Sequence, residues 1–319
     1  MIALRWTHDG RSALAGLVGG GLVMLSRDGD ERWRRDGHGF GLSSLACHPS
    51  STQAVTGGQD GRVRVWNLED GAVVADLDAG APWVEAVRWN TAGTMLAAAA
   101  GRGVRVWSRD GVLVREWPKH RATVSDLQWQ PGRDLLCSTS YGGVTLLDPA
   151  RDEPLRQFSW QGSSLVAQWS PSGKYIATGE QDSSVHFWIV DTGKDLQMTG
   201  YPVKIRELSW DHTSRYLATG GGNEAVVWDC GGKGPSGRTP ILLPGHEQRV
   251  TAVAYQHGGS LLASGGADGR VVLWQPSAKK VLVGATQLSQ AVSQLSWSPD
   301  DRELLAGCAN GDVAVISRP

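Results

Sequence analysis

The stretch "TGGQDGRVRVWN", Thr56–Asn67, places a glycine pair and an acidic turn directly before alternating valines that end in tryptophan. The same arrangement returns as "TGEQDSSVHFWI" from Thr178 and as "SGGADGRVVLWQ" from Ser264. A tight Gly/Asp turn followed by a period-two apolar pattern predicts a β-hairpin. Because the hairpin recurs, the chain is expected to consist of repeated supersecondary units.

A second signal, an apolar-x-aromatic anchor, sets the period of the repeat. Successive anchors lie 42, 41, 40, 40, 41, 45 and 42 residues apart. They end at Trp6, His48, Trp89, Trp129, Trp169, Trp210, Tyr255 and Trp297. Each unit shows strand-like alternation and no amphipathic helical period.

Four short strands in units of about 40 residues are typical of a β-propeller, in which neighbouring blades cover each other's apolar faces. We therefore expect an all-β propeller of four-stranded antiparallel blades, with eight blades favoured and seven as the alternative. The chain stops on "VAVISRP", so the last blade is expected to be three-stranded. The whole chain, 1–319, is predicted to be a single domain with repeats at approximately 1–41, 42–82, 83–122, 123–162, 163–203, 204–248, 249–290 and 291–319.

These residues resemble the WD40-repeat family over essentially the whole chain. That family's fuller repeats carry a hydrogen-bonded tetrad of His, Ser/Thr, Asp and Trp, and two repeats here match it with spacings of 18, 4 and 6. The matching residues are His38, Thr56, Asp60 and Trp66 in one repeat and His246, Ser264, Asp268 and Trp274 in the other. A third repeat keeps Thr178, Asp182 and Trp188 but has Trp160 in place of His, and Thr219, Asn223 and Trp228 form a weaker version.

Composition excludes several classes of function. The net charge is −1, with Lys and Arg spread along the chain, so no nucleic-acid partner is expected. The apolar stretch Ala13–Leu25 is in register with the repeat and is interpreted as strand, so no membrane association is expected. Four widely spaced cysteines indicate free thiols in a reducing compartment, and we expect a cytoplasmic location.

Catalytic and cofactor motifs are not evident in the sequence. The eight histidines are dispersed without metal-ligand spacing, so neither a metal nor a cofactor is expected. "GKGPSG", Gly232–Gly237, formally matches GxGxxG but is followed by another strand pattern, which favours a loop over a dinucleotide site.

Family resemblance implies that partners dock on the top face, which the second-to-third-strand turns and the loops before each first strand form. Exposed aromatic and arginine side chains there suit an interface. The residues at those positions are Gln59, Trp83, Glu85, Tyr141, Trp160, Gln181, Tyr201, Lys204, Arg206, Arg249 and Thr251. Trp160 and Tyr201 stand where other repeats have His, so capping of their own blades is an equal alternative for both.

The sequence therefore predicts a non-catalytic platform for protein or peptide partners, a monomer within a larger assembly. Two alternatives stay open. One is a propeller enzyme of the metal-dependent hydrolase or lactonase type, and the other is a sensor or regulatory module of a larger multidomain protein.

Overall fold

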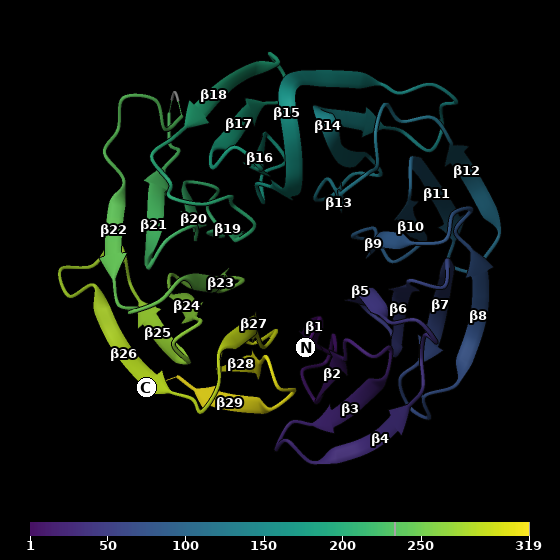
Figure 1. Cartoon of the computed structure of the whole chain (residues 1–319), viewed down its shortest axis with the longest axis horizontal. Coiled ribbons are helices and arrows are strands. Elements are labelled where there is room, and N and C mark those ends of the chain that lie inside the picture. Colours follow the sequence, from purple (N-terminus) through teal and green to yellow (C-terminus); the bar gives the residue numbers. More distant parts are fainter. Residues whose placement is uncertain (233, 319) are drawn as a thin grey trace. The chain divides into compact units, whose positions relative to one another are not determined.

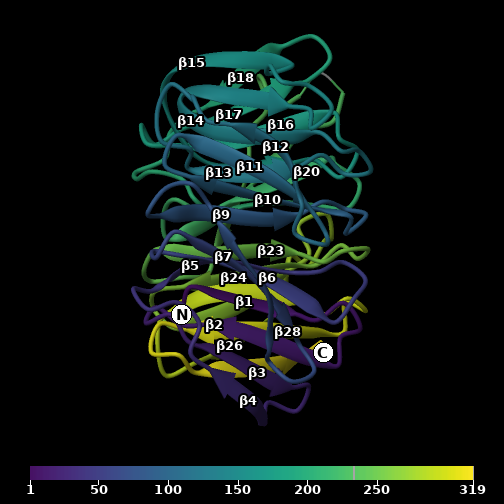
Figure 2. The ribbon, with the colours of Figure 1, turned by 90° about the vertical axis from the view of Figure 1, so that its right-hand side faces the viewer.

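A computed structural model describes residues 1–232 and 234–318, so Lys233 of the "GKGPSG" loop lies outside the described residues. The chain divides into two compact units, Ile2–Ala167 and Gln168–Pro319, and Met1 groups with the second. Figures 1 and 2 show strands joined by turns, and no helix occurs in the described part of the chain. No helix able to cross a membrane is found among these residues.

The unit Ile2–Ala167 contains three four-stranded antiparallel sheets and the start of a fourth sheet (Figure 1). The first sheet contains β1 (Ala3–Trp6), β2 (Ser12–Gly16), β3 (Leu22–Ser26) and β4 (Glu31–Arg35). The second contains β5 (Leu42–Cys47), β6 (Gln53–Gly58), β7 (Arg62–Asn67) and β8 (Val73–Asp78). The third contains β9 (Val84–Trp89), β10 (Met95–Ala100), β11 (Gly103–Ser108) and β12 (Leu113–Trp117).

A six-stranded sheet follows, with the order β13 to β18. Its strands are β13 (Asp126–Trp129), β14 (Leu136–Leu147), β15 (Arg156–Trp169), β16 (Tyr175–Glu180), β17 (Val185–Ile189) and β18 (Lys194–Met198). Within β14 the hydroxyl of Ser138 donates to the carbonyl of Thr145 at 3.4 Å, although seven extended residues span about 23 Å. The chain therefore reverses inside β14, at Gly142 and Gly143, which both have positive φ.

Three further sheets complete the unit Gln168–Pro319. The first contains β19 (Leu208–Trp210), β20 (Tyr216–Thr219), β21 (Glu224–Asp229) and β22 (Ile241–Pro244). The second contains β23 (Val250–Tyr255), β24 (Leu262–Gly266), β25 (Arg270–Trp274) and β26 (Leu282–Gln287). The last has three strands, β27 (Val292–Trp297), β28 (Glu303–Cys308) and β29 (Val313–Ser317).

The favoured count of eight blades is wrong, because the described strands form seven sheets. The all-β propeller class and the three-stranded last blade agree with the structure. The miscount has a local cause. β15 runs without a break from the outer strand of the fourth sequence repeat into the first strand of the fifth, so these two repeats share one sheet. The number of anchor residues gives the number of sequence repeats. It does not show where one strand continues from one repeat into the next.

The anchor residues close the first hairpin of each sheet. Trp89 pairs with Leu96, and Trp129 pairs with Leu136. In the second repeat Cys47, and not His48, holds this position, because Cys47 pairs with Ala54. The His48 ring instead packs edge-on against Trp89, with ring centroids 4.8 Å apart.

Several anchor tryptophans also donate a hydrogen bond to the strand that carries the preceding anchor residue. The indole N–H of Trp129 donates to the carbonyl of Arg88 at 3.1 Å. In the other unit Trp297 donates to Ala254 at 3.0 Å, and Trp210 donates to Gln168 at 3.3 Å. These three tryptophans therefore tie neighbouring anchor strands together, whereas the indole N–H of Trp89 is buried without an acceptor among the described residues.

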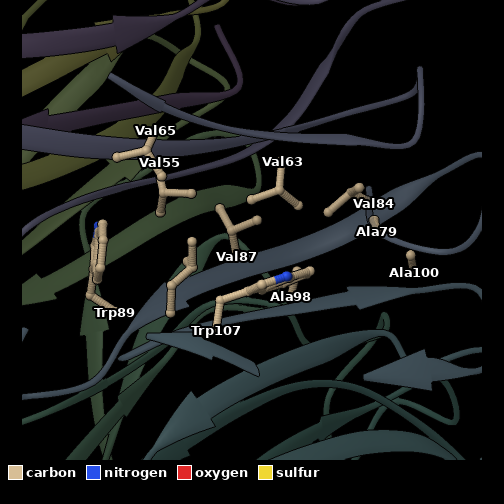
Figure 3. Packing of buried hydrophobic residues seen from close by; sticks show 11 residues of the cluster. Val55, Val63, Val65, Ala79, Val84, Val87, Trp89, Ala98, Ala100 and Trp107 are labelled. Atoms are coloured by element: carbon tan, nitrogen blue, oxygen red, sulfur yellow. The ribbon is translucent and has the colours of Figure 1, made fainter. Parts of the chain in front are cut away.

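Apolar side chains fill the space between the second and third sheets. Val55, Val63 and Val65 of the second sheet pack with Val87 and Trp107 of the third, all at most 4% exposed (Figure 3). Adjacent sheets thus bury faces that a single sheet would leave in water, which is the main stabilising contribution in this architecture.

We expect Trp129→Phe to lower the free energy of unfolding by about 1–3 kcal/mol, because it removes the buried N–H donor to Arg88 and shrinks the ring. Urea unfolding of the full chain measures this effect. The matched control is Trp83→Phe, since Trp83 is 48% exposed, and we expect its effect to stay within about 0.5 kcal/mol. Equal losses in the two variants would show that the indole bond contributes nothing of its own.

Candidate functional site

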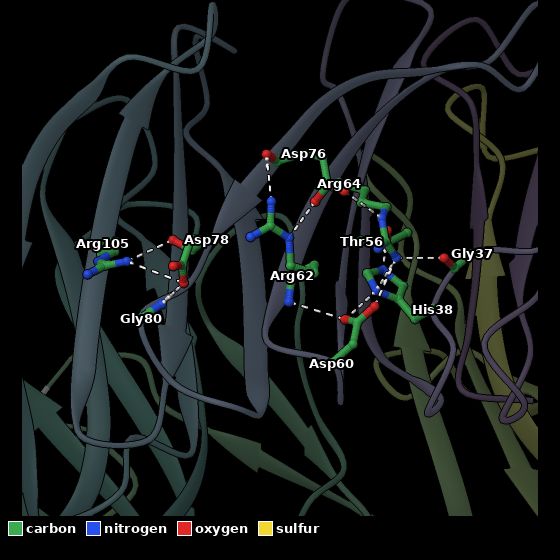
Figure 4. Close-up of polar contacts among 10 residues, drawn as sticks. All are labelled: Gly37, His38, Thr56, Asp60, Arg62, Arg64, Asp76, Asp78, Gly80 and Arg105. Carbon is green, nitrogen blue, oxygen red and sulfur yellow. Dashed lines mark hydrogen bonds and ion pairs between the residues drawn. The ribbon is translucent and has the colours of Figure 1, made fainter.

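In the second sheet, His38, Thr56, Asp60 and Trp66 form one hydrogen-bonded chain. The His38 ring lies 2.8 Å from Asp60 through Nδ1 and 2.8 Å from the Thr56 hydroxyl through Nε2 (Figure 4). Trp66 donates its indole N–H to the same hydroxyl at 2.7 Å. Asp60 therefore fixes the ring with its Nδ1 protonated, and Nε2 accepts from Thr56.

The sheet of β23 to β26 repeats this geometry. His246 lies 2.8 Å from Ser264 and 3.2 Å from Asp268, and Trp274 donates to Ser264 at 2.8 Å. The backbone N–H groups of Glu247 and Arg270 also donate to Asp268. The carboxylate of each tetrad thus accepts several internal hydrogen bonds, which gives it a structural role.

Other repeats carry substituted versions of the tetrad. Tyr201 replaces His, with its hydroxyl 2.9 Å from Thr219 and accepting from the indole N–H of Trp228 at 2.7 Å. Its hydroxyl is therefore used inside the fold, which favours the capping alternative for Tyr201. Trp188 donates to Thr178 at 3.4 Å, whereas Asp182 is exposed and accepts from Ser184.

Burial and hydrogen bonding shift the pKa values of the tetrad in one consistent direction. Burial lowers the pKa of His38 and of His246, and the nearby carboxylates only partly oppose this. Burial acts to raise the pKa of Asp60, but hydrogen bonds from His38 and Arg62 and the charge of Arg64 outweigh it, so the pKa is lowered. The tetrads therefore favour neutral imidazoles beside ionised carboxylates.

The register of the sheets shows which loops share an end. Leu42 of β5 pairs with Gly58 of β6, so the loop before β5 and the turn after β6 lie at the same end of that sheet. Val84 and Ala100 pair in the same way in the next sheet. The positions chosen from the sequence therefore lie at or near strand ends, except that Tyr141 lies at the reversal inside β14 and Trp160 lies within β15. They are divided between the two units.

In the unit Ile2–Ala167, Trp83 is 48% exposed and Tyr141 is 52% exposed, whereas Gln59, Glu85 and Trp160 are half-buried. In the other unit Gln181, Lys204, Arg206 and Arg249 are exposed, whereas Tyr201 and Thr251 are half-buried. The role of all eleven residues as partner contacts stays a prediction.

Two of these residues have structural contacts that the sequence did not reveal. The hydroxyl of Thr251 donates to the carbonyls of Gly265 and Val292, which joins β23 to β24 and to the next sheet. Arg249 lies 3.9 Å from the carboxylate of Glu207, whose side chain is only 9% exposed. Burial raises the pKa of Glu207.

Sequence reasoning missed Phe40, which is 78% exposed in the loop before β5. Gly41 beside it lies close to the next turn, because a Cβ there would come within 2.9 Å of the Val18 carbonyl and 3.3 Å of the Gln59 side chain. Val18 is itself 61% exposed. A large aromatic between two glycines in a loop was the available signal.

A metal centre is not formed by the residues that the structure covers, since no group of three His, Cys, Asp or Glu side chains lies close enough to hold an ion. The four cysteines form no disulfide with one another.

Four segments of the chain match one protein-family model. Residues 29–67, 154–188, 237–275 and 279–317 match the family model described as WD domain, G-beta repeat. Protein HIR1 of Cryptococcus neoformans var. neoformans is 24% identical over 330 residues, covering 86% of this chain and 38% of the relative. THO complex subunit 3 of Arabidopsis thaliana is 26% identical over 225 residues, covering 67% of this chain and 70% of the relative.

The computationally designed Ika8 protein has a similar fold, with a TM-score of 0.84 and 21% identity over 99% of this chain and 95% of that one. The chain spans only 38% of the length of the HIR1 protein of Cryptococcus and 32% of that of Mycosarcoma maydis.

We expect Thr56→Val to lower the free energy of unfolding by at least about 2 kcal/mol, because the isosteric change leaves the His38 ring and the Trp66 N–H without their shared hydroxyl. Thermal or urea unfolding measures the loss. Thr56→Ser keeps the hydroxyl and should retain most of the stability. A loss in Thr56→Ser as large as that in Thr56→Val would show that stability is as sensitive to the methyl group as to the hydroxyl, which would contradict a special role for the shared hydrogen bonds.

We also expect stability to fall as the pH drops from 7 to 5. His38 and His246 have pKa values below the unfolded value of about 6.5, so protons bind more readily to the unfolded chain in this window, with a limit of about 1.4 kcal/mol per pH unit per group. Below about pH 4 the lowered pKa values of Asp60 and Asp268 add to the loss. Urea midpoints at each pH measure the slope.

In the double variant His38→Gln, His246→Gln the slope between pH 7 and 5 should be shallower. It should not vanish, since burial also lowers the pKa values of His48, His120 and His186. An unchanged slope would show that the tetrad histidines do not carry the pH dependence.

Proposed function

We propose that this chain, a member of the WD40-repeat family, is a non-catalytic platform that binds protein or peptide partners through loops at the strand ends of its sheets. The observation that supports this most directly is the exposure of Trp83 directly before β9 and of Tyr141 at the reversal inside β14. Large aromatic side chains supply much of the contact energy in protein interfaces. They lie on elements whose backbones are held by sheet pairing, which keeps them in place for a partner.

The polar chemistry of the tetrads supports a binding role over an enzymatic one. His38, His246 and their carboxylates are saturated by hydrogen bonds within the fold. A general base needs a free ring nitrogen or carboxylate oxygen within reach of substrate. We therefore propose that the chain is not an enzyme.

Relatives support an assembly role. One similar protein is named as a subunit of the THO complex, and the HIR1 relatives are longer than this chain. We propose protein partners in a larger assembly, with this chain as a monomer there. In the alternative, a regulatory module of a larger multidomain protein, the binding partner would be another domain of the same polypeptide. A cytoplasmic location and the absence of nucleic-acid and membrane partners are also proposals, based on free cysteines and a net charge of −1.

The double variant Trp83→Ala, Tyr141→Ala tests the platform. We expect affinity capture from the native cell extract, followed by mass spectrometry, to recover a partner with the wild-type chain and to lose it with this variant, because the variant lacks the two exposed aromatic anchors. The Arg249→Ala variant tests the other unit in the same assay.

The matched control is Val73→Ala, Leu113→Ala, since these apolar side chains are 45% and 49% exposed on the outer strands β8 and β12. Partner loss in the control alone would move the interface to the outer strands. Absence of any captured partner would contradict the platform and call for hydrolase assays.

A further inference from the structure

The fourth repeat keeps the His and the hydroxyl of the tetrad but lacks both its acid and its Trp. The His120 ring lies 2.9 Å from the Ser138 hydroxyl through Nε2, matching the 2.8 Å between His38 and Thr56. Four residues after Thr56 stands Asp60, but four residues after Ser138 stands Gly142. The imidazole and hydroxyl are therefore present while the carboxylate of the complete tetrads is missing.

The position of the missing acid is open. A Cβ built at Gly142 would meet only Cδ of Arg121, at 3.8 Å, and Nε2 of Gln157, at 4.0 Å. A cavity of about 540 Å³ borders this position through Arg121 and Gln157, which belong to its lining, whereas Gly142 itself does not. Its lining includes Trp117, Pro118, Lys119, His120, Arg121 and Gln157.

The cavity is rich in hydrogen-bond donors that have no acceptor. Lys119 and Arg121 are exposed, and neither side chain has an ion-pair partner among the described residues. Trp117 is only 4% exposed, and its buried indole N–H has no acceptor among the described residues. These groups favour a ligand that accepts hydrogen bonds and carries negative charge.

Acidic residues of the lining limit how much negative charge the cavity accepts. Asp152 is already paired with Arg115, but Glu153 has no such partner in the described chain. Two free cations beside one free carboxylate suit a single negative charge better than a doubly charged phosphate. The side chain of Pro154 and the rings of Pro118 and Trp117 offer apolar contact for neighbouring atoms of a peptide.

We propose that this cavity binds the carboxylate of an aspartate or glutamate on an extended segment of a protein partner, in the place of the missing tetrad acid. Arg121 and Gln157 donate to the carboxylate, and Lys119 adds charge at the rim. This inference rests on the proposed platform function and names the chemistry of one of its partners.

His120 lines the cavity as a neutral ring, so it does not supply the positive charge that the carboxylate needs. Burial lowers the pKa of His120, and its Nδ1 lies 3.2 Å from the carbonyl of Arg102, so the neutral ring donates there. Recognition of the acid consequently depends on the two exposed cations.

Titration of the full chain with a peptide, monitored by ¹H–¹⁵N NMR, tests the proposal. The probe is Ac-Gly-Asp-Pro-Gly-NH₂, and the neutral probe has Asn in place of Asp. We expect the Asp peptide to shift the amides of Arg121, Ser140 and Gly142 with a Kd of roughly 1 mM, and the Asn peptide to bind roughly tenfold more weakly. Arg121→Gln should weaken Asp-peptide binding, whereas the control Arg133→Gln, an exposed arginine of the same unit, should leave it unchanged.

Each other result would overturn the proposal. Equal binding of the Asp and Asn peptides would exclude carboxylate recognition, and unchanged binding in Arg121→Gln would exclude this cavity. A third peptide carries phosphoserine in place of Asp, and tighter binding of this peptide than of the Asp peptide would overturn carboxylate recognition in favour of phosphate. If the Asp peptide fails while partner capture still depends on Trp83 and Tyr141, only this inference falls. If no partner is captured, the platform proposal falls, and the inference that rests on it falls with it even if the Asp peptide binds.

Discussion

The hydrogen bond from an anchor tryptophan to the first strand of the preceding sheet is the constraint on which the arrangement within each unit depends. Trp129 reaches Arg88 in one unit, and Trp297 reaches Ala254 in the other. Hydroxyls of the first strands make a second link, as Ser43 does to Val84 and Thr251 does to Val292. These polar links fix the offset between sheets, while apolar burial supplies the attraction, which has no direction of its own.

The tetrads add a connection within single sheets. A buried hydroxyl on the second strand, Thr56 or Ser264, receives the indole of the third strand and holds the imidazole of the preceding loop. Gly58 and Gly266 stand beside the rings because a Cβ would come within about 2.4 Å of the imidazole atoms. The loops before β5 and β23 are thereby held in place by hydrogen bonds to their own sheets.

Two repeats that depart from the tetrad pattern differ in whether the lost side chain is replaced by another hydrogen-bonding group. Where Tyr201 replaces histidine, the hydrogen bonds to Thr219 and Trp228 are kept, so the change is structural. Where Gly142 replaces the acid, nothing inside the described chain compensates, and a cavity with free donors results. Tyr201 is therefore a structural variation, whereas the position of Gly142 borders a candidate binding site.

The sequence by itself determined the all-β class and the hairpin at Thr56–Asn67, because these follow from periodicity along the chain. The members of both complete tetrads came from the resemblance to the WD40-repeat family, whose spacing they match. The sequence also identified loop and turn positions such as Trp83 and Tyr141, since turns are read locally. Only the tertiary structure decided that two repeats share a sheet through β15, that Cys47 takes the anchor position of His48, and that Thr251 and Tyr201 bond inside the fold. The physical reason is that strand continuity, pairing register and the direction of a side chain depend on residues some 40 positions away, whose contacts no local pattern records.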